Sequence, residues 1–234
     1  MTVVLAPQNA TTHRPQVTQP LKAIAIGDSL VYGYGDLSGG GWAERLRRLW
    51  MHPDSSGNVL YNLGVRGDKT AQVAARFEAE FSSRGELRNR VPDVAIISVG
   101  TNDTPFLGRP DGKPMTPQNV FKHDLTLLLE NATSCCRTIF IGMVPVVSER
   151  MPFLDCLYYD RAAQHAYKEI TREMCRIRGV PYLDIFELWT ARGTAWIERR
   201  IGPDGLHPNE LGYQSLFDDI ASWSPIVELT AAPA

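Results

Sequence analysis

The 234-residue sequence has few cysteines, no long apolar run and almost no net charge. Four cysteines without a Cys-x-x-Cys pair do not suit a disulfide scaffold, zinc binding or thioredoxin chemistry, so buried free thiols are expected. No apolar run approaches the roughly 18 residues of a membrane-spanning helix. With 24 basic and 26 acidic residues, no overall field attracts nucleic acid or an anionic membrane. These absences predict a soluble globular chain with no nucleic-acid partner and no integral membrane segment.

Sequence length and the ends of the chain indicate one domain. The first twenty residues are rich in Thr, Pro and Gln and lack the basic and apolar regions of a secretory signal. We therefore predict a disordered N-terminal tail over residues 1–20, a single domain over residues 21–226 and a short C-terminal tail over residues 227–234. Without a visible signal, the cytoplasm is the expected location.

Short apolar runs alternate with helical patterns along the whole chain. The runs that predict strands are residues 23–26, 58–62, 93–99, 138–144 and 180–185. The helical patterns span residues 42–51, 70–81, 117–131, 154–178 and 209–223. This alternation predicts a parallel sheet between layers of helices. Functional groups in such sheets lie on loops beyond the carboxyl ends of the strands, so motifs that directly follow a strand are of interest.

A serine and a histidine at opposite ends of the chain are the first candidates. Ser29 follows the first predicted strand within Gly27-Asp28-Ser29-Leu30, where an exposed nucleophile could lie. A serine hydroxyl needs a base, and His207 in Asp204-Gly205-Leu206-His207-Pro208 has the local context that the other four histidines lack. Asp204 could fix the imidazole tautomer and stabilise the imidazolium. The alternative for Ser29 is a helix cap without chemistry.

Two further loops also follow predicted strands. Residues 62–70 contain Gly64, whose backbone N–H could approach a ligand closely, and residues 100–103 contain Asn102, whose amide could donate a hydrogen bond. Together with the Ser29 N–H, these groups could form an oxyanion hole for acyl transfer. Each loop alone is equally explained by the turn chemistry of Gly and Asn.

The four segments together resemble the SGNH-hydrolase superfamily, also called the GDSL esterase/lipase family, whose four blocks occur in this order. The matching segments are Gly27-Asp28-Ser29-Leu30, Asn62-x-Gly64-x-x-Gly67-x-x-Thr70, Gly100-Thr101-Asn102-Asp103 and Asp204-x-x-His207-Pro208. The resemblance spans residues 23–213. It implies a flavodoxin-like three-layer α/β/α sandwich with a central, mainly parallel five-stranded sheet.

The resemblance also implies an activity. It implies a serine hydrolase that cleaves carboxylic esters or thioesters through an acyl-enzyme, with a small-molecule acyl compound as substrate. The implied triad has Ser29 as nucleophile, His207 as general base and Asp204 as its orienting group. The implied oxyanion donors are Ser29, Gly64 and Asn102. No cofactor and no metal are implied.

The sequence disfavours three other classes of protein and leaves two alternatives of the same fold open. An ordinary α/β-hydrolase needs a Gly-x-Ser-x-Gly pentapeptide in mid-chain, which the sequence lacks. A nucleotide-binding protein would carry a phosphate-binding glycine motif, which is also missing. One Asp-x-x-His pair offers too few ligands for a metal hydrolase. A carbohydrate acetylesterase of the same fold, or a silent acyl- or carbohydrate-binding module, stays open.

Two loops are candidates for the walls of a substrate site. Residues 103–117 are long and rich in proline, and they directly follow Asn102, so we expect a lip over the site. Residues 146–157 are a candidate second wall. The apolar side chains expected to line them are Phe106, Leu107, Met115, Met151, Phe153 and Leu154. The alternative, of equal weight, is that these side chains only bury the loops.

Overall fold

The central sheet is parallel throughout. The computed structural model describes residues 20–53, 57–85 and 90–230. The strands of the central sheet are β1 (Lys22–Gly27), β2 (Val59–Gly64), β3 (Val94–Ser98), β6 (Arg137–Ile141) and β8 (Tyr182–Leu183). They are hydrogen-bonded in the order β2-β1-β3-β6-β8, and every pairing is parallel. All residues of β1 and β3 are buried, which explains why these runs are apolar almost throughout.

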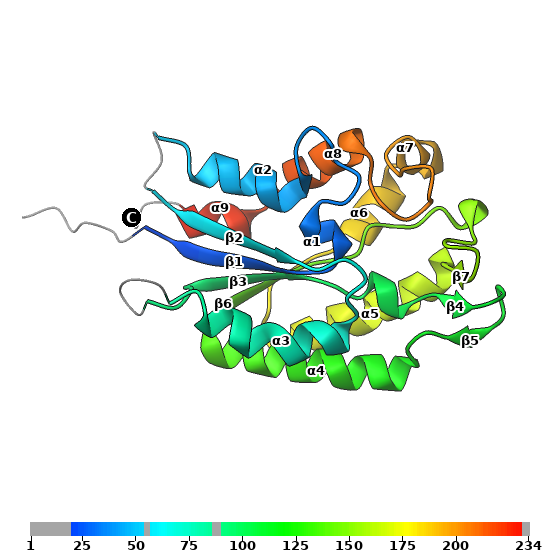
Figure 1. Ribbon diagram of the computed structural model, residues 1–234, viewed down its shortest axis with the longest axis horizontal. Helices are drawn as coiled ribbons and strands as arrows, with labels where there is room; N and C mark the ends of the chain where they lie inside the picture. The colour runs from blue at the N-terminus through cyan, green and yellow to red at the C-terminus, as the bar shows by residue number, and fades with distance from the viewer. Residues whose placement is uncertain (1–19, 54–56, 86–89, 231–234) are drawn as a thin grey trace, which may run out of the picture.

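Helices cover both faces of this sheet (Figure 1). One face carries α1 (Ser29–Tyr32), α2 (Gly41–Trp50), α6 (Ile185–Ala191), α8 (Glu210–Ala221) and α9 (Ser224–Thr230), with α7 (Thr194–Glu198) near its edge. The other face carries α3 (Thr70–Ser82), α4 (Gln118–Cys135) and α5 (Arg161–Ile177). The predicted three-layer α/β/α sandwich is confirmed. Within the described ranges, no helix is both long and apolar enough to cross a membrane.

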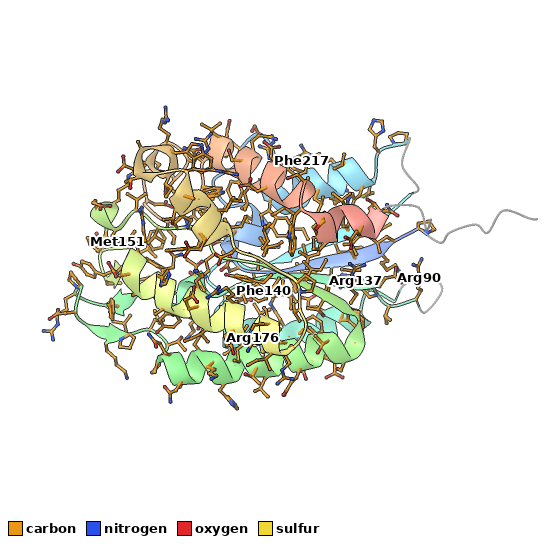
Figure 2. All side chains as sticks on the ribbon, turned by 180° about the vertical axis from the view of Figure 1, so that it is seen from behind. Arg90, Arg137, Phe140, Met151, Arg176 and Phe217 are labelled. Atoms are coloured by element: carbon orange, nitrogen blue, oxygen red, sulfur yellow. The ribbon has the colours of Figure 1, made fainter. Side chains whose placement is uncertain are left out.

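The period-two alternation of β1 divides the core between the two faces. Ala23 and Ala25 pack in one buried cluster with Trp42 of α2, whereas Ile24 and Ile26 pack in the other with Phe77 of α3. Small residues thus lie on the side of the large indole ring. Figure 2 shows Phe140 of β6 in the interior and Met151 at one end of the molecule.

A second, smaller sheet lies beyond the carboxyl end of the central one (Figure 1). It is antiparallel and has the order β5-β4-β7, with β4 (Phe106–Leu107), β5 (Lys113–Pro114) and β7 (Leu157–Tyr158). β4 and β5 come from the loop after β3, and β7 comes from the loop after β6. The two loops expected to form walls are therefore joined to each other by backbone hydrogen bonds.

Some expected boundaries need correction. The helix predicted over residues 154–178 begins only at Arg161, because Asp160 caps it by accepting from the Ala163 N–H. The residues before it form β7 and a turn in which Leu154 and Asp155 have φ of 52° and 60°. The helices α6 and α7 were not predicted.

Other corrections concern the ends of the chain and the thiols. The predicted C-terminal tail starts inside α9, a helix that reaches Thr230 and buries Ile226. The predicted N-terminal tail, apart from Pro20, lies outside the described residues. Of the four free cysteines only Cys175 is buried, while Cys136 is half-buried and Cys135 and Cys156 are exposed, so the expectation of buried thiols was wrong for most.

Candidate active site

Ser29 is placed by the turn that joins β1 to α1. β1 ends at Gly27, and Asp28 caps the short helix by accepting from the Leu30 N–H at 2.9 Å. Ser29 is therefore the first helical residue, and its own N–H has no acceptor within the helix. The Ser29 side chain lies at the carboxyl edge of the sheet, where the sequence predicted it.

Ser29, His207 and Asp204 form a continuous chain of hydrogen bonds. The Ser29 Oγ lies 2.8 Å from the His207 Nε2, and the His207 Nδ1 lies 2.6 Å from the Asp204 Oδ2. A carboxylate only accepts, so Nδ1 carries the hydrogen and Nε2 is left to accept from the serine hydroxyl. Ser29 and His207 are each 6% exposed, which shields the chain from water. This arrangement can deprotonate the Ser29 hydroxyl.

Backbone hydrogen bonds hold the Asp204 carboxylate in this position. Its Oδ1 accepts from the N–H groups of Leu206 and His207, both at 3.0 Å. Burial alone would raise the pKa of Asp204, but hydrogen bonds from the His207 ring and from these two backbone groups lower it below its ordinary value. Asp204 is therefore the ionised partner that the imidazole requires.

An arginine from another loop supports the Asp204 turn. η3 (Ser148–Arg150) carries Arg150, whose guanidinium donates to the carbonyls of Ile201 and Gly202 at 2.9 and 2.7 Å. The Val147 N–H donates to the Gly205 carbonyl at 2.8 Å. The loop after β6 thus fixes the loop that carries His207, a link between residues about 50 positions apart that no local pattern reveals.

Asn102 lies close to the same edge, on the short turn η2 (Thr101–Asp103) after β3. Its Nδ2 donates to the Asp68 carbonyl at 3.0 Å, and its Oδ1 accepts from the Tyr159 hydroxyl at 3.2 Å. The second hydrogen of Nδ2 has no acceptor within the part of the chain that is described. Two opposite partners fix which end of the amide carries its donors, and one donor stays available.

The structure does not favour Gly64 as an oxyanion donor. Its N–H donates to the Asn62 Oδ1 at 3.0 Å, and a Cβ at this position would lie 2.1 Å from the Tyr32 backbone nitrogen. Glycine is needed there because β2 passes close to the backbone of α1. Gly67, two positions before the next helix-capping residue, has a φ of +81° and nothing within 4 Å of its missing Cβ. Within the described ranges, its N–H has no acceptor.

Three buried carboxyls, those of Asp28, Asp68 and Asp103, lie beneath this edge. Burial raises the pKa of Asp28 to about 7; the Leu30 N–H lowers it, whereas the nearby Asp103 and Asp68 raise it. Burial also raises the pKa of Asp103, although Thr70 donates to it through both its N–H and its hydroxyl. Asp68 instead pairs with Arg76 at 2.8 Å.

Aromatic rings surround His207. The Tyr34 ring meets the imidazole edge-on at 4.7 Å between centroids, and the Phe153 ring does so at 5.9 Å. Phe153 in turn contacts Tyr159 at 6.2 Å. The candidate wall over residues 146–157 therefore does contact the site through Phe153. None of Tyr34, Tyr159 and Arg150 was singled out from the sequence, because an isolated Tyr or Arg carries no signal until its neighbours are known.

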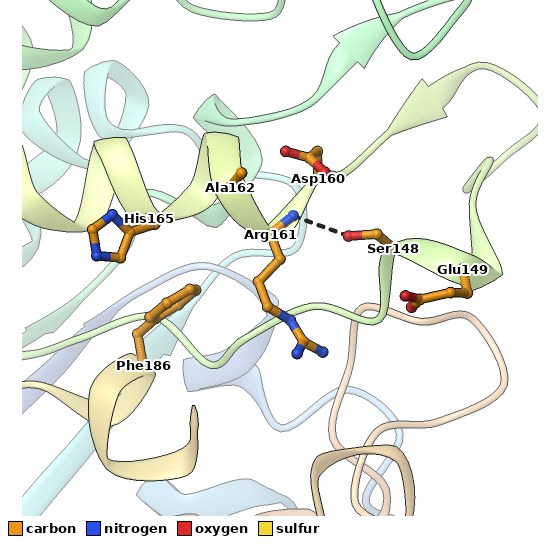
Figure 3. Close-up of a pocket in the computed structure, with 7 residues that line it drawn as sticks. All are labelled: Ser148, Glu149, Asp160, Arg161, Ala162, His165 and Phe186. Atoms are coloured by element: carbon orange, nitrogen blue, oxygen red, sulfur yellow. Dashed lines mark hydrogen bonds between the residues drawn. The ribbon is translucent and has the colours of Figure 1, made fainter. Parts of the chain in front are cut away.

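A separate cavity of about 500 Å³ lies beside the start of α5 (Figure 3). Arg161, His165 and Phe186 line it, and the Arg161 N–H donates to the Ser148 Oγ at 2.9 Å. His165 also lies near Glu169 and Glu187, with candidate ligand atoms within 4.8 Å of one another.

The ammonium group of Lys168 lies between the carboxylates of Glu169 and Glu187. Its Nζ lies 2.5 Å from a Glu169 oxygen and 2.8 Å from a Glu187 oxygen, and the side chain is 1% exposed. A metal ion would have to displace a cation that the fold already holds. We therefore assign no metal to these residues.

The sequence matches the family model of the GDSL-like lipase/acylhydrolase family over residues 25–215. The chain belongs to this family. Membership in the GDSL-like lipase/acylhydrolase family makes it an ester-hydrolysing enzyme with a small-molecule ester substrate. The recognised motifs lie within the matched residues and come together at the carboxyl edge of the sheet.

Solved structures of similar fold include other proteins with hydrolase names. A lipase/acylhydrolase from Enterococcus faecalis has a TM-score of 0.71 and 20% identity, covering 92% of this chain and 100% of that chain. An acetyl xylan esterase, AlAXEase, has a TM-score of 0.67 and 18% identity, covering 88% and 100%. The esterase EstA from Pseudoalteromonas sp. has a TM-score of 0.62 and 17% identity, covering 88% and 96%. A comparison with curated proteins finds no match.

Proposed function

We propose that this GDSL-family enzyme is a serine hydrolase that cleaves carboxylic esters or thioesters through an acyl-enzyme on Ser29. The observation that carries the proposal is the unbroken chain from the Ser29 Oγ to the His207 Nε2 and from the His207 Nδ1 to Asp204, at 2.8 and 2.6 Å. At these distances His207 can accept the proton of the Ser29 hydroxyl, and the Asp204 carboxylate can orient the imidazole.

The reaction proceeds in two halves. The Ser29 Oγ attacks the carbonyl carbon while its proton passes to the His207 Nε2, and the carbonyl oxygen becomes an oxyanion. The tetrahedral intermediate then expels the alcohol or thiol, which takes the proton from His207. Water repeats the sequence on the acyl-enzyme, releasing the acid and restoring Ser29. Asp204 stays ionised and stabilises the imidazolium.

For the oxyanion, we propose three donors: the Ser29 N–H, the free hydrogen of the Asn102 amide, and the N–H of Gly67 in place of Gly64. Three observations support Gly67. Its N–H lacks an acceptor among the described residues, its Cα face is open, and its neighbour Asp68 directly binds Asn102. The Gly64 amide is already engaged by Asn62. Aligned donors of this kind stabilise charge as it develops.

Covalent labelling tests the nucleophile. A fluorophosphonate probe should label Ser29, and Ser29→Ala should abolish both labelling and the hydrolysis of 4-nitrophenyl acetate. Because members of a triad act as a unit, His207→Ala should be nearly as damaging. The matched control is Ser38→Ala, which removes an exposed hydroxyl on the loop after α1 that bonds to Asp36. Peptide mapping that places the label on another serine would refute the assignment.

The same experiment separates an enzyme from a silent binding module. A module that only binds acyl compounds or carbohydrates has no activated serine and should not react with the probe. An acetylated xylo-oligosaccharide assayed beside 4-nitrophenyl acetate tests the carbohydrate acetylesterase alternative. The similar fold of an acetyl xylan esterase is the reason to include this substrate.

A further inference from the structure

Within the described part of the chain, Arg66 has no polar partner. It is exposed on the loop between β2 and α3, and its guanidinium lies over the ring of Tyr34. Among the arginines of the described residues, it is the one that makes neither a hydrogen bond nor an ion pair. Its five N–H donors therefore have no protein acceptor within the described residues, although the guanidinium lies against a ring.

The contact fixes Arg66 beside the Ser29–His207 pair. The Arg66 guanidinium carbon lies 3.9 Å from the centroid of the Tyr34 ring. The same ring meets the His207 imidazole at 4.7 Å. Only one aromatic ring therefore separates the guanidinium from the imidazole. This contact uses the face of the tyrosine ring, and no hydrogen bond or ion pair within the described residues uses the guanidinium N–H donors, whose fork geometry matches a carboxylate.

No carboxylate of the residues that the structure describes takes these donors. Asp68, two residues along the same loop, is bound by Arg76 at 2.8 Å. Asp204 is occupied by His207 and two backbone N–H groups. Asp28 and Asp103 are buried, with 1% and no exposed surface. Each of these acids is therefore either paired with another group or buried, and Arg66 is left without an acidic partner among the described residues.

We propose that Arg66 forms a subsite for a carboxylate carried by the ester substrate, so that the enzyme prefers anionic esters to neutral ones. The inference rests on the proposed function, because the carboxylate must reach Arg66 while the ester carbonyl lies at Ser29. A bidentate pair with Arg66 orients the substrate as well as attracting it. The neighbouring Gly67, a proposed oxyanion donor, ties this subsite to the reacting carbonyl through one peptide unit.

Two matched pairs of esters test the subsite. The first pair is mono-4-nitrophenyl glutarate and its neutral methyl ester, which place the charge on the acyl side. The second pair is 3-acetoxybenzoate and its methyl ester, which place the charge on the leaving group. For each pair the measured quantity is the ratio of kcat/KM for the anionic ester to kcat/KM for the neutral one. The pair that responds identifies the side of the ester that faces Arg66.

For one of the two pairs, the ratio of kcat/KM values should be roughly 5- to 20-fold higher in the wild-type enzyme than in Arg66→Gln. This factor lies between the effect of an exposed ion pair and that of a charge-assisted hydrogen bond. Arg66→Lys should give an intermediate ratio, because it keeps the charge and loses the fork. High salt should reduce the wild-type ratio.

The matched control is Arg176→Gln. Arg176 lies in the last turn of α5 and pairs with Glu173, so its loss changes the net charge equally (Figure 2). This variant should keep the wild-type ratios. Equal ratios in wild type and Arg66→Gln for both pairs would overturn the subsite. If Ser29 is not labelled and the neutral esters are not hydrolysed, the proposed function itself has failed.

Discussion

The Asn102 amide is held by a partner at each end. The Tyr159 hydroxyl can only donate to Oδ1 in this arrangement, because the Asp68 carbonyl already defines the nitrogen end. Tyr159 is 3% exposed, and its burial raises the pKa of its phenol, so the hydroxyl keeps its proton. We therefore regard Tyr159 as a positioning residue that prevents rotation of the amide.

Substitutions of Asn102 and Tyr159 should both lower kcat, but by different factors. Asn102→Ala removes a proposed oxyanion donor and should lower kcat by roughly 10²–10³-fold. Tyr159→Phe removes only the orienting hydrogen bond, worth about 1 kcal/mol, and should lower kcat by about 5-fold. KM should change little in both, provided that it reflects substrate binding.

Stability measurements separate this role from a merely structural one. Tyr158→Phe, on the neighbouring half-buried residue of β7, is the matched control and should keep the wild-type kcat. Each variant is compared by thermal midpoint and by turnover per folded molecule. A destabilised Asn102→Ala enzyme with normal turnover would remove Asn102 from the catalytic residues.

Sequence reasoning reached some of these residues and not others. Ser29, His207 and Asp204 could be predicted to converge because each belongs to a motif whose chemistry is incomplete alone. The sequence analysis named Gly64 as an oxyanion donor, and the proposal of Gly67 in its place depends on which amide already has an acceptor, which the sequence does not show. Tyr159 contacts a residue 57 positions away and Arg150 contacts residues 51 and 52 positions away, separations that no local periodicity encodes.

At the scale of elements, the small antiparallel sheet is what brings the candidate wall to the site. β4 pairs with both β5 and β7, and Phe153 forms a bridge with Leu157. This pairing holds the loop after β6 so that Phe153 lies beside His207. The sequence predicted a wall over residues 146–157, but its helix assignment from residue 154 was wrong. Two-residue strands are too short to leave a periodic pattern.

The position of Phe153 predicts a role in acyl selectivity. If its ring supplies apolar surface to the acyl chain, each methylene buried there contributes up to about 0.8 kcal/mol. Wild-type kcat/KM should then rise from 4-nitrophenyl acetate to butyrate, and Phe153→Ala should flatten this rise by about 3- to 10-fold. Leu154→Ala is the control, because Leu154 lies on the same turn but is 71% exposed. An unchanged chain-length profile in Phe153→Ala would contradict the role.

At the scale of the whole molecule, the sequence predicted the three layers of the fold but not all of its elements. Strands buried on both faces leave apolar runs, and helices packed on one side leave a repeating stripe, so the order of elements was readable. The second sheet, the helices α6 and α7 and the true start of α5 depend on tertiary contacts instead. The same holds for α9, which buries Ile226 and packs Leu229 against the core.

The buried acid next to Ser29 should be visible in the stability of the entire domain. Asp28 titrates near pH 7 in the folded protein because burial opposes its charge, against an ordinary value of 3.8. Between these values the unfolded chain has lost the proton and the native state retains it, so the native state is progressively disfavoured as pH rises. A difference of about three pH units corresponds to at most about 4 kcal/mol.

The variant Asp28→Asn isolates this effect, because an asparagine keeps the cap to the Leu30 N–H and cannot ionise. Its free energy of unfolding, relative to wild type, should increase by up to about 4 kcal/mol from pH 4 to pH 8, measured by urea denaturation.

Asp36→Asn is the control, because the pKa of Asp36 is shifted in the opposite direction. Burial raises the pKa of Asp36, but the N–H groups of Gly39 and Gly41 and the Arg45 side chain lower it below its ordinary value. The stability from Asp36 is therefore lost only as pH falls below about 4, and its variant should be destabilised by a constant amount between pH 5 and pH 8. A stability difference for Asp28→Asn that does not change with pH would show that Asp28 is ionised in the folded protein throughout this range.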